Sequence, residues 1–144
     1  MFRRVALIIF YDKQGRILLQ DRTGLSKAGE LWGYFGGGIE PGETPEQAVI
    51  RETREELSYT LKQCISAGIV KTTDKRGTIE RHVFLAPLPS VKKLKQKEGK
   101  SMKLFTLREA KKAKSVFGDD EVIKKLEKMG KFHFQQPSIK ENLQ

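Results

Sequence analysis

The sequence has few of the residues that build disulfides or zinc sites. Among its 144 residues are one cysteine, Cys64, and two histidines, His82 and His133, which are far apart in the chain. One cysteine excludes an intramolecular disulfide, and this set offers no zinc-binding constellation. Because a lone thiol is typical of proteins from reducing compartments, we expect a cytoplasmic protein.

Long apolar runs are also missing. The run at residues 5–10 contains six residues and ends at Tyr11-Asp12. A membrane-spanning helix needs about 20 apolar residues, and a signal peptide needs an apolar core of roughly 7–15. We therefore expect a buried strand at residues 5–10 and no membrane association.

Acidic residues are outnumbered, with 18 Asp and Glu against 28 Lys and Arg and a net charge of +10. Residues 91–114 contain ten basic and two acidic residues, a local balance of +8. Such a run is usually a solvated face, and neither interleaved aromatics nor an RNA-binding motif accompanies it. We expect a phosphate-bearing small molecule as partner, and nucleic acid stays an open alternative.

The length suits one domain with a core of its own. Neither a linker nor an internal repeat divides the chain. We expect a single domain over residues 1–136, followed by a frayed tail over residues 137–144. The oligomeric state is left open by the sequence.

The most strongly marked element is a helix predicted over residues 44–57. Thr44 suits the N-cap, Pro45 suits the first helical position, and Gln47 completes a Thr-x-x-Gln capping box. At about 100° per residue, apolar side chains occupy one arc of this helix and carboxylates a second. The carboxylate arc consists of Glu52, Glu55 and Glu56.

Three like charges on one arc repel one another by roughly a few tenths of a kcal/mol per pair. A merely solvated acidic face is the common alternative. A divalent cation would reverse the repulsion, since Mg²⁺ binds a few carboxylates together with substrate phosphate oxygens. We predict a metal site at Glu52, Glu55 and Glu56. Because Glu56 borders the apolar arc, we expect it to be the least exposed of the three.

The glutamates belong to a longer pattern, G-x₅-E-x₇-R-E-x₂-E-E, that begins at Gly37 and includes Glu43 and Arg51. With this composition, six such positions arise by chance with a probability on the order of 10⁻⁵ per chain. The pattern resembles the signature of the Nudix hydrolases, which cleave nucleoside diphosphates linked to another group. The chain departs from the signature at three positions that concern packing and the helix exit: Thr53, Ser58 and Tyr59.

This resemblance implies an α/β fold, an α/β/α sandwich with a mixed central sheet. It also implies Mg²⁺, with Mn²⁺ as an alternative, held by the three glutamates and the main-chain carbonyl of Gly37. Glu43 and Arg51 would form a salt bridge that braces the loop against the helix. The general base in such proteins comes from the signature or from a later loop, where Glu98 is the candidate here. A solvated Glu98 is an equal alternative, and Glu80 is a weaker candidate for the base.

Outside this helix, apolar runs and turn residues predict the remaining elements. The predicted strands lie at residues 5–10, 16–20, 65–72, 79–85 and 102–107, with a short one at 32–35 and a last one near 132–134. Helices are predicted at residues 107–114 and 119–129.

Aromatic and acidic residues suggest a base-binding pocket. Trp32 and Phe35 precede the glycines, and Phe117 precedes Asp119 and Asp120. From this placement we expect at least one of the aromatics to stack on a nucleobase. The segments also resemble oxidised purine nucleoside triphosphatases, which implies that the aspartates read the edge of the base. Core packing of the aromatics and helix capping by the aspartates are the alternatives.

The sequence thus predicts Mg²⁺-dependent hydrolysis of a phosphoanhydride bond in nucleoside triphosphates or related nucleoside diphosphate derivatives, with sanitation of oxidised purine nucleotides as one form of it. The alternative from another class is a non-catalytic nucleotide- or RNA-binding module on the same fold.

Overall fold

The computed structural model describes residues 1–23, 32–97, 101–113 and 119–130. Their elements are, in chain order, β1 (Phe2–Tyr11), β2 (Ile17–Asp21), β3 (Trp32–Gly33), β4 (Phe35–Gly38), α1 (Pro45–Leu57), β5 (Ile65–Asp74), β6 (Gly77–Pro87), the 3-10 turn η1 (Val91–Lys93), β7 (Met102–Phe105), α2 (Leu107–Lys112) and α3 (Asp119–Met129). No helix in these four ranges is long and apolar enough to cross a membrane.

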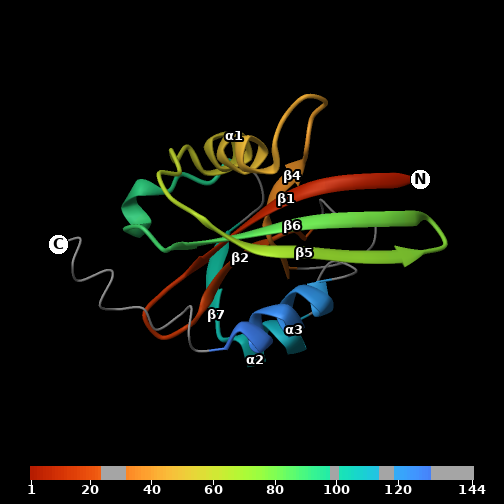
Figure 1. The fold of residues 1–144 in the computed structure, drawn as a ribbon. Coiled ribbons are helices and arrows are strands. Elements are labelled where there is room, and N and C mark those ends of the chain that lie inside the picture. Colours follow the sequence, from red (N-terminus) through yellow and green to blue (C-terminus); the bar gives the residue numbers. More distant parts are fainter. Residues whose placement is uncertain (24–31, 98–100, 114–118, 131–144) are drawn as a thin grey trace.

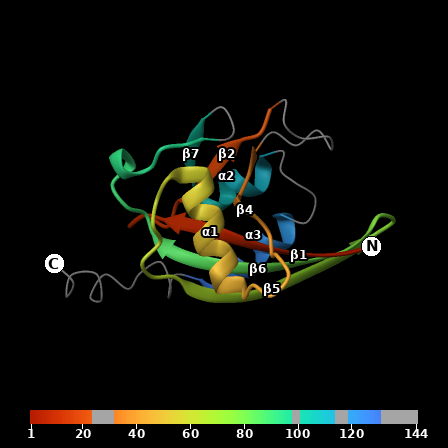
Figure 2. The ribbon, with the colours of Figure 1, turned by 90° about the horizontal axis from the view of Figure 1, so that it is seen from above.

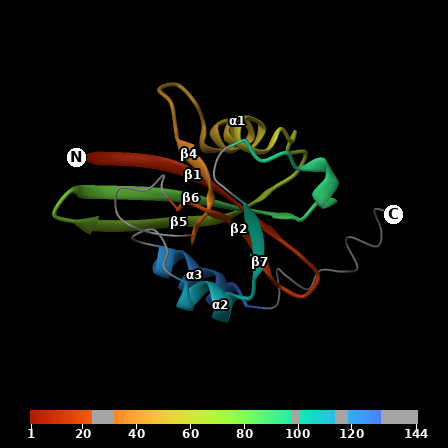
Figure 3. The same cartoon turned by 180° about the vertical axis from the view of Figure 1, so that it is seen from behind.

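A seven-stranded mixed sheet forms the middle layer. Its strands run in the order β3-β2-β1-β6-β5, while β4 also pairs with β1 and β7 with β2. The central pair, β1 and β6, is parallel over ten register positions, and all other pairs are antiparallel. Helix α1 covers one face, and α2 and α3 cover the other (Figures 1 and 3). The predicted α/β/α sandwich is confirmed.

Helix α1 begins and ends as its sequence predicts. The Thr44 side chain accepts a hydrogen bond from the Gln47 N–H, and the Gln47 side chain accepts one from the Thr44 N–H, so the capping box is complete. At the other end, Ser58 adopts a left-handed conformation with φ 51°. Figure 2 shows that α1 lies across the strands and not along them.

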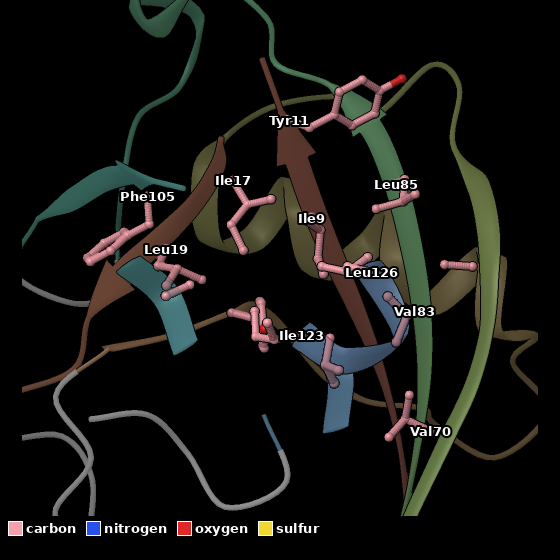
Figure 4. Packing of buried hydrophobic residues seen from close by; sticks show 14 residues of the cluster. Ile9, Tyr11, Ile17, Leu19, Val70, Val83, Leu85, Phe105, Ile123 and Leu126 are labelled. Atoms are coloured by element: carbon pink, nitrogen blue, oxygen red, sulfur yellow. The ribbon is translucent and has the colours of Figure 1, made fainter. Parts of the chain in front are cut away.

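The alternation of side chains along β1 supplies both cores. Ile9 and Tyr11 contribute to the cluster on the α2–α3 side, and Ile8 and Phe10 contribute to the cluster under α1. Figure 4 shows the first cluster, with Ile123 and Leu126 of α3 facing the strands. Fully burying a side chain of this size stabilises the fold by about 1.5–3 kcal/mol, so the strand is held from both faces.

The predicted strand at residues 102–107 ends earlier, at Phe105. Thr106 is the N-cap of α2, and its side chain and that of Glu109 form a second capping box. The cap takes Thr106 out of the strand, and Leu107 becomes the first helical residue. The predicted last strand near residues 132–134 and the tail at 137–144 lie outside the described residues.

The sheet is split beside β1. Strand β2 pairs with β1 only at Tyr11 and Ile17, whereas β4 pairs with the other half of β1, where Ile8 lies opposite Phe35. The two neighbours of β1 on this side therefore diverge, and one edge of β4 has no strand beside it in the described part of the chain. The main-chain groups on this edge need other partners, since unpaired buried peptide groups are costly.

Candidate active site

The three glutamates of α1 differ in exposure. Glu55 is exposed, Glu52 is half-buried, and Glu56 is buried with only 6% of its surface accessible. The expectation that Glu56 is the least exposed is confirmed. Burying a carboxylate to this degree costs free energy unless hydrogen bonds replace those it made to water.

Glu56 is held through its side chain and its main chain. Its Oε1 accepts a hydrogen bond of 2.8 Å from the Gly36 N–H. Its carbonyl oxygen, at the end of α1, accepts a hydrogen bond of 2.8 Å from the Lys97 N–H. Strand β4 and the segment after η1 therefore meet at this one residue.

Two glycines allow this close approach. Gly36 has φ 141°, and a Cβ at that position would collide with the carbonyl oxygen of Ala6. A Cβ on Gly37 would collide with the carboxylate of Glu52. Glycine is therefore required at Gly36, where the obstacle is backbone, whereas a side chain at Gly37 would displace the carboxylate of Glu52.

Arg51 is the centre of the charged network. Its Nε and Nη2 donate to the two carboxylate oxygens of Glu43 at 2.7 and 3.0 Å, and Nη2 also donates to the Gly38 carbonyl at 2.9 Å. Its Nη1 donates to Glu55 at 3.0 Å and to Glu52 at 3.2 Å. This bidentate geometry fixes the glycine-rich loop on α1, as the resemblance implied for Glu43 and Arg51.

The same contact shifts the pKa of both partners. The Arg51 hydrogen bond, with a second one from the Glu40 N–H, lowers the pKa of Glu43 to about 2, and the carboxylate in turn raises the pKa of Arg51. Because the pKa of Glu43 is depressed in the folded state, its contribution to stability is present above the ordinary value near 4.5 and is lost as the pH falls through about 2.

We therefore expect Arg51→Met to destabilise the protein at pH 6 and to do so less at pH 2.5, because there Glu43 is partly protonated. Urea unfolding of parent and variant at both pH values measures the difference. Arg54→Met, at an exposed position of the same helix, is the control and should show no such trend. An effect of Arg51→Met that is equal at both pH values would contradict the assignment.

The glutamates offer the donor chemistry of a divalent cation site. Mg²⁺ prefers carboxylate and carbonyl oxygens, and three carboxylates lie within one turn and a half of helix beside the glycines. Within the described residues, however, no three acidic, histidine or cysteine side chains converge on one point. The predicted cluster is not assembled because Arg51 is the countercharge of Glu52 and Glu55, while Glu56 faces Gly36. The chemistry of the donors, carboxylate and carbonyl oxygens, fits a divalent cation.

Most of the chain matches a known protein family. Residues 1–126 match the family model described as the NUDIX domain. The chain belongs to the Nudix family. Nudix hydrolases generally use divalent metal ions.

Curated relatives of this Nudix chain include the 8-oxo-dGTP diphosphatase of Proteus vulgaris, 37% identical over 60 residues, which are 42% of this chain and 54% of the relative. The CTP pyrophosphohydrolase of Escherichia coli K12 is 46% identical over 57 residues, 40% of this chain and 41% of the relative. The chain thus spans about half the length of the curated relatives it matches.

Solved structures share the fold across most of the chain. The MutT protein of Methanosarcina mazei is 20% identical, with a TM-score of 0.76, and the match covers 90% of this chain and 96% of the MutT chain. The E. coli ORF135 protein is 24% identical, with a TM-score of 0.74, and the match covers 89% of this chain and 90% of the ORF135 chain.

The two described aromatic residues that were predicted to bind the base differ in their burial in this Nudix fold. Phe35 is fully buried in the cluster under α1, so its assignment to substrate binding is wrong, and it is a core residue. Trp32 is half-buried and packs edge-to-face on Phe105, with ring centroids 4.9 Å apart. Trp32 retains an accessible surface and stays a candidate for stacking.

The remaining candidates lie at or beyond the limits of the described residues. Glu98 and Phe117 are outside them, although the chain before Glu98 reaches the end of α1 at Lys97. Asp119 and Asp120 form the start of α3, and their side chains are not among those described.

Glu80, the weaker candidate for the base, already has partners. Its Oε1 lies 2.8 Å from His82 Nε2 and 3.3 Å from Arg4 Nε. These contacts, that of His82 above all, lower the pKa of Glu80, which makes it a weaker proton acceptor. Glu80 is therefore part of a surface network on the sheet.

One residue at the site was missed by the sequence analysis. Gln20 is fully buried, and its Nε2 donates a hydrogen bond of 3.0 Å to the carbonyl of Tyr34, just before the glycines. The only signal in the sequence was a polar residue that follows three apolar ones in a predicted strand. A buried polar side chain in such a place is informative.

Proposed function

We propose that this chain is a Mg²⁺-dependent pyrophosphohydrolase of nucleoside triphosphates or related nucleoside diphosphate derivatives, with Mn²⁺ as an alternative cation. The observation that carries the proposal is the buried Glu56, held by the Gly36 N–H beside two further glutamates. A buried carboxylate in such a setting is typical of functional sites. Family membership and the relatives named for 8-oxo-dGTP and CTP support the same reaction class.

Glu52, Glu55 and Glu56, with the Gly37 carbonyl, would hold the cation. When bound, the cation neutralises phosphate charge and favours attack by water. The water oxygen attacks phosphorus, the phosphoanhydride bond breaks, and a nucleoside monophosphate and pyrophosphate leave. Arg51 and Glu43 would hold the glycine loop in place during this reaction through their bidentate contact.

A carboxylate must accept the proton of the attacking water. We propose Glu98 or one of the signature glutamates for this role. The Lys97 N–H, which binds the Glu56 carbonyl, supports Glu98 because it anchors the preceding residue at the end of the catalytic helix.

We further propose that oxidised purine nucleoside triphosphates are substrates. Trp32 and Phe117 would stack on the base, an interaction that contributes about 1–3 kcal/mol, and Asp119 and Asp120 would bind its edge. The relative from Proteus vulgaris, named for 8-oxo-dGTP, supports this choice.

We expect pyrophosphate release from 8-oxo-dGTP, 2-oxo-dATP, dGTP or CTP with Mg²⁺, and none with a chelator in excess. The catalytic efficiencies of the parent, Asp119→Asn and Asp120→Asn measure base selectivity. If the aspartates bind the base edge, the ratios between substrates change by about tenfold, since an unpaired polar edge costs about 1–3 kcal/mol.

If the catalytic efficiency changed equally for all four nucleotides, the aspartates would serve only the helix and would have no role in base selectivity. Two results together would favour the non-catalytic module. The protein would hydrolyse no nucleotide, capped RNA included, and it would bind RNA tightly with an affinity that falls steeply as salt is raised.

A further inference from the structure

Gln20 is a buried polar residue that the proposed reaction does not use. It is fully buried on β2, where the neighbouring Leu18 and Leu19 belong to the two apolar cores. Its Nε2 donates to the Tyr34 carbonyl, and its Oε1 has no hydrogen-bond partner in the described part of the chain. A leucine or methionine would suit the apolar surroundings but would withdraw this donor from the Tyr34 carbonyl, so the amide at this position acts on the backbone before Gly36.

The hydrogen bond from Gln20 lies in a row with hydrogen bonds from two residues of the candidate site. In an antiparallel strand, alternate residues direct their main-chain groups to the same edge. On the edge of β4 that faces away from β1, Gln20 binds the carbonyl of Tyr34, Glu56 binds the N–H of Gly36, and Arg51 binds the carbonyl of Gly38. Three side chains thus replace the missing neighbour strand.

The chain on either side of residues 98–100 contacts the neighbourhood of both residues. The Lys97 N–H donates to the carbonyl of Glu56, and the carbonyl of Ser101 accepts from the N–H of Asp21, the residue after Gln20. The side chains of Gln20 and Glu56 bind the same short stretch of backbone, at Tyr34 and at Gly36.

We propose that Gln20 is a positioning residue for Glu56. By holding the Tyr34 carbonyl, the Gln20 amide fixes the short stretch of backbone that leads to Gly36, and the Gly36 N–H in turn fixes the Glu56 carboxylate. Gln20 contacts neither substrate nor cation in this scheme. The inference rests on the proposed function for its kinetic consequence, but its structural consequence at Gly36 is independent of the reaction.

The test replaces Gln20 with methionine, which has a similar volume and no donor. We expect the kcat for the best nucleotide to fall about tenfold, equal to about 1.4 kcal/mol, with KM changed less than about twofold. The amide resonance of Gly36 should shift, and its hydrogen exchange should become faster. The melting temperature should fall only moderately, because the variant withdraws one donor from the Tyr34 carbonyl but also removes the unpartnered oxygen.

Leu18→Met is the matched control, since it introduces the same residue two positions earlier on the same face of β2. It should leave kcat and the Gly36 amide unchanged. If Gln20→Met does not fold, Gln20→Asn withdraws the amide from Tyr34 by one methylene and should give the same shifts.

An unchanged Gly36 amide, or a fall in melting temperature with kcat intact, would overturn the proposal and leave Gln20 a structural residue. Should the parent hydrolyse no nucleotide, the proposed function fails. The Gly36 resonance in the same variants then still decides whether Gln20 positions this part of the chain.

Discussion

Glu56→Gln should lower turnover about 10³-fold while the protein keeps its fold. The amide oxygen of glutamine can still accept the hydrogen bond from Gly36, so the buried contact at 2.8 Å survives. What is lost is a negative charge in a buried site, where charged ligands have their greatest effect on the transition state. Initial rates across Mg²⁺ concentrations, together with thermal unfolding, measure both parts of this expectation.

Glu46→Gln is the matched control, because Glu46 lies exposed in the first turn of the same helix. Its turnover should stay within about twofold of the parent. If Glu56→Gln retained the turnover of the parent with the best substrate, the assignment of Glu56 to the cation would be wrong.

Gly36→Ala should cost the protein at least about 3 kcal/mol of stability. The new Cβ would meet the carbonyl of Ala6 on the central strand, and φ of 141° is a conformation that alanine rarely adopts. Since the obstacle is backbone of a buried strand and not a flexible side chain, relief requires β4 to move away from β1. Urea unfolding at pH 7 measures the loss.

Gly38→Ala provides the comparison within the same strand, because a Cβ at Gly38 meets nothing within 4 Å. Its stability should stay within about 0.5 kcal/mol of the parent, as for ordinary surface changes. Equal losses in the two variants would show that the glycines act through chain flexibility and not through the close approach to Ala6.

Local signals in the sequence predicted the elements of the fold well. The capping box at Thr44 and Gln47 marks the start of α1 to the residue, and the hairpin turns mark β5 and β6. These signals succeed because caps and turns depend on residues a few positions apart. The second capping box, at Thr106, was present in the sequence and was overlooked, which misplaced the end of β7.

Local patterns predicted the site where its residues share one helix, and the resemblance to a family added the contact of Glu43 with Arg51. Glu52, Glu55 and Glu56 follow from helical periodicity, and the burial of Glu56 follows from its place at the edge of the apolar arc. Phe35 could not be placed, because an aromatic residue beside glycines suits a core and a base pocket equally. The contact of Gln20 with Tyr34 depends on how β2 diverges from β4, which no local pattern encodes.

The parallel pairing of β1 with β6 also constrains the order in which this chain can fold. Phe2 lies opposite Thr78 and Tyr11 opposite Pro87, so β1 finds its longest partner only after the much later β6 has been made. The β5–β6 hairpin and α1 involve neighbouring residues and can form early, whereas closing so long a loop is entropically costly and slow. Until then β1, which carries part of both cores, exposes its apolar side chains on either face. Strand β1 therefore needs protection from aggregation until β6 has been made.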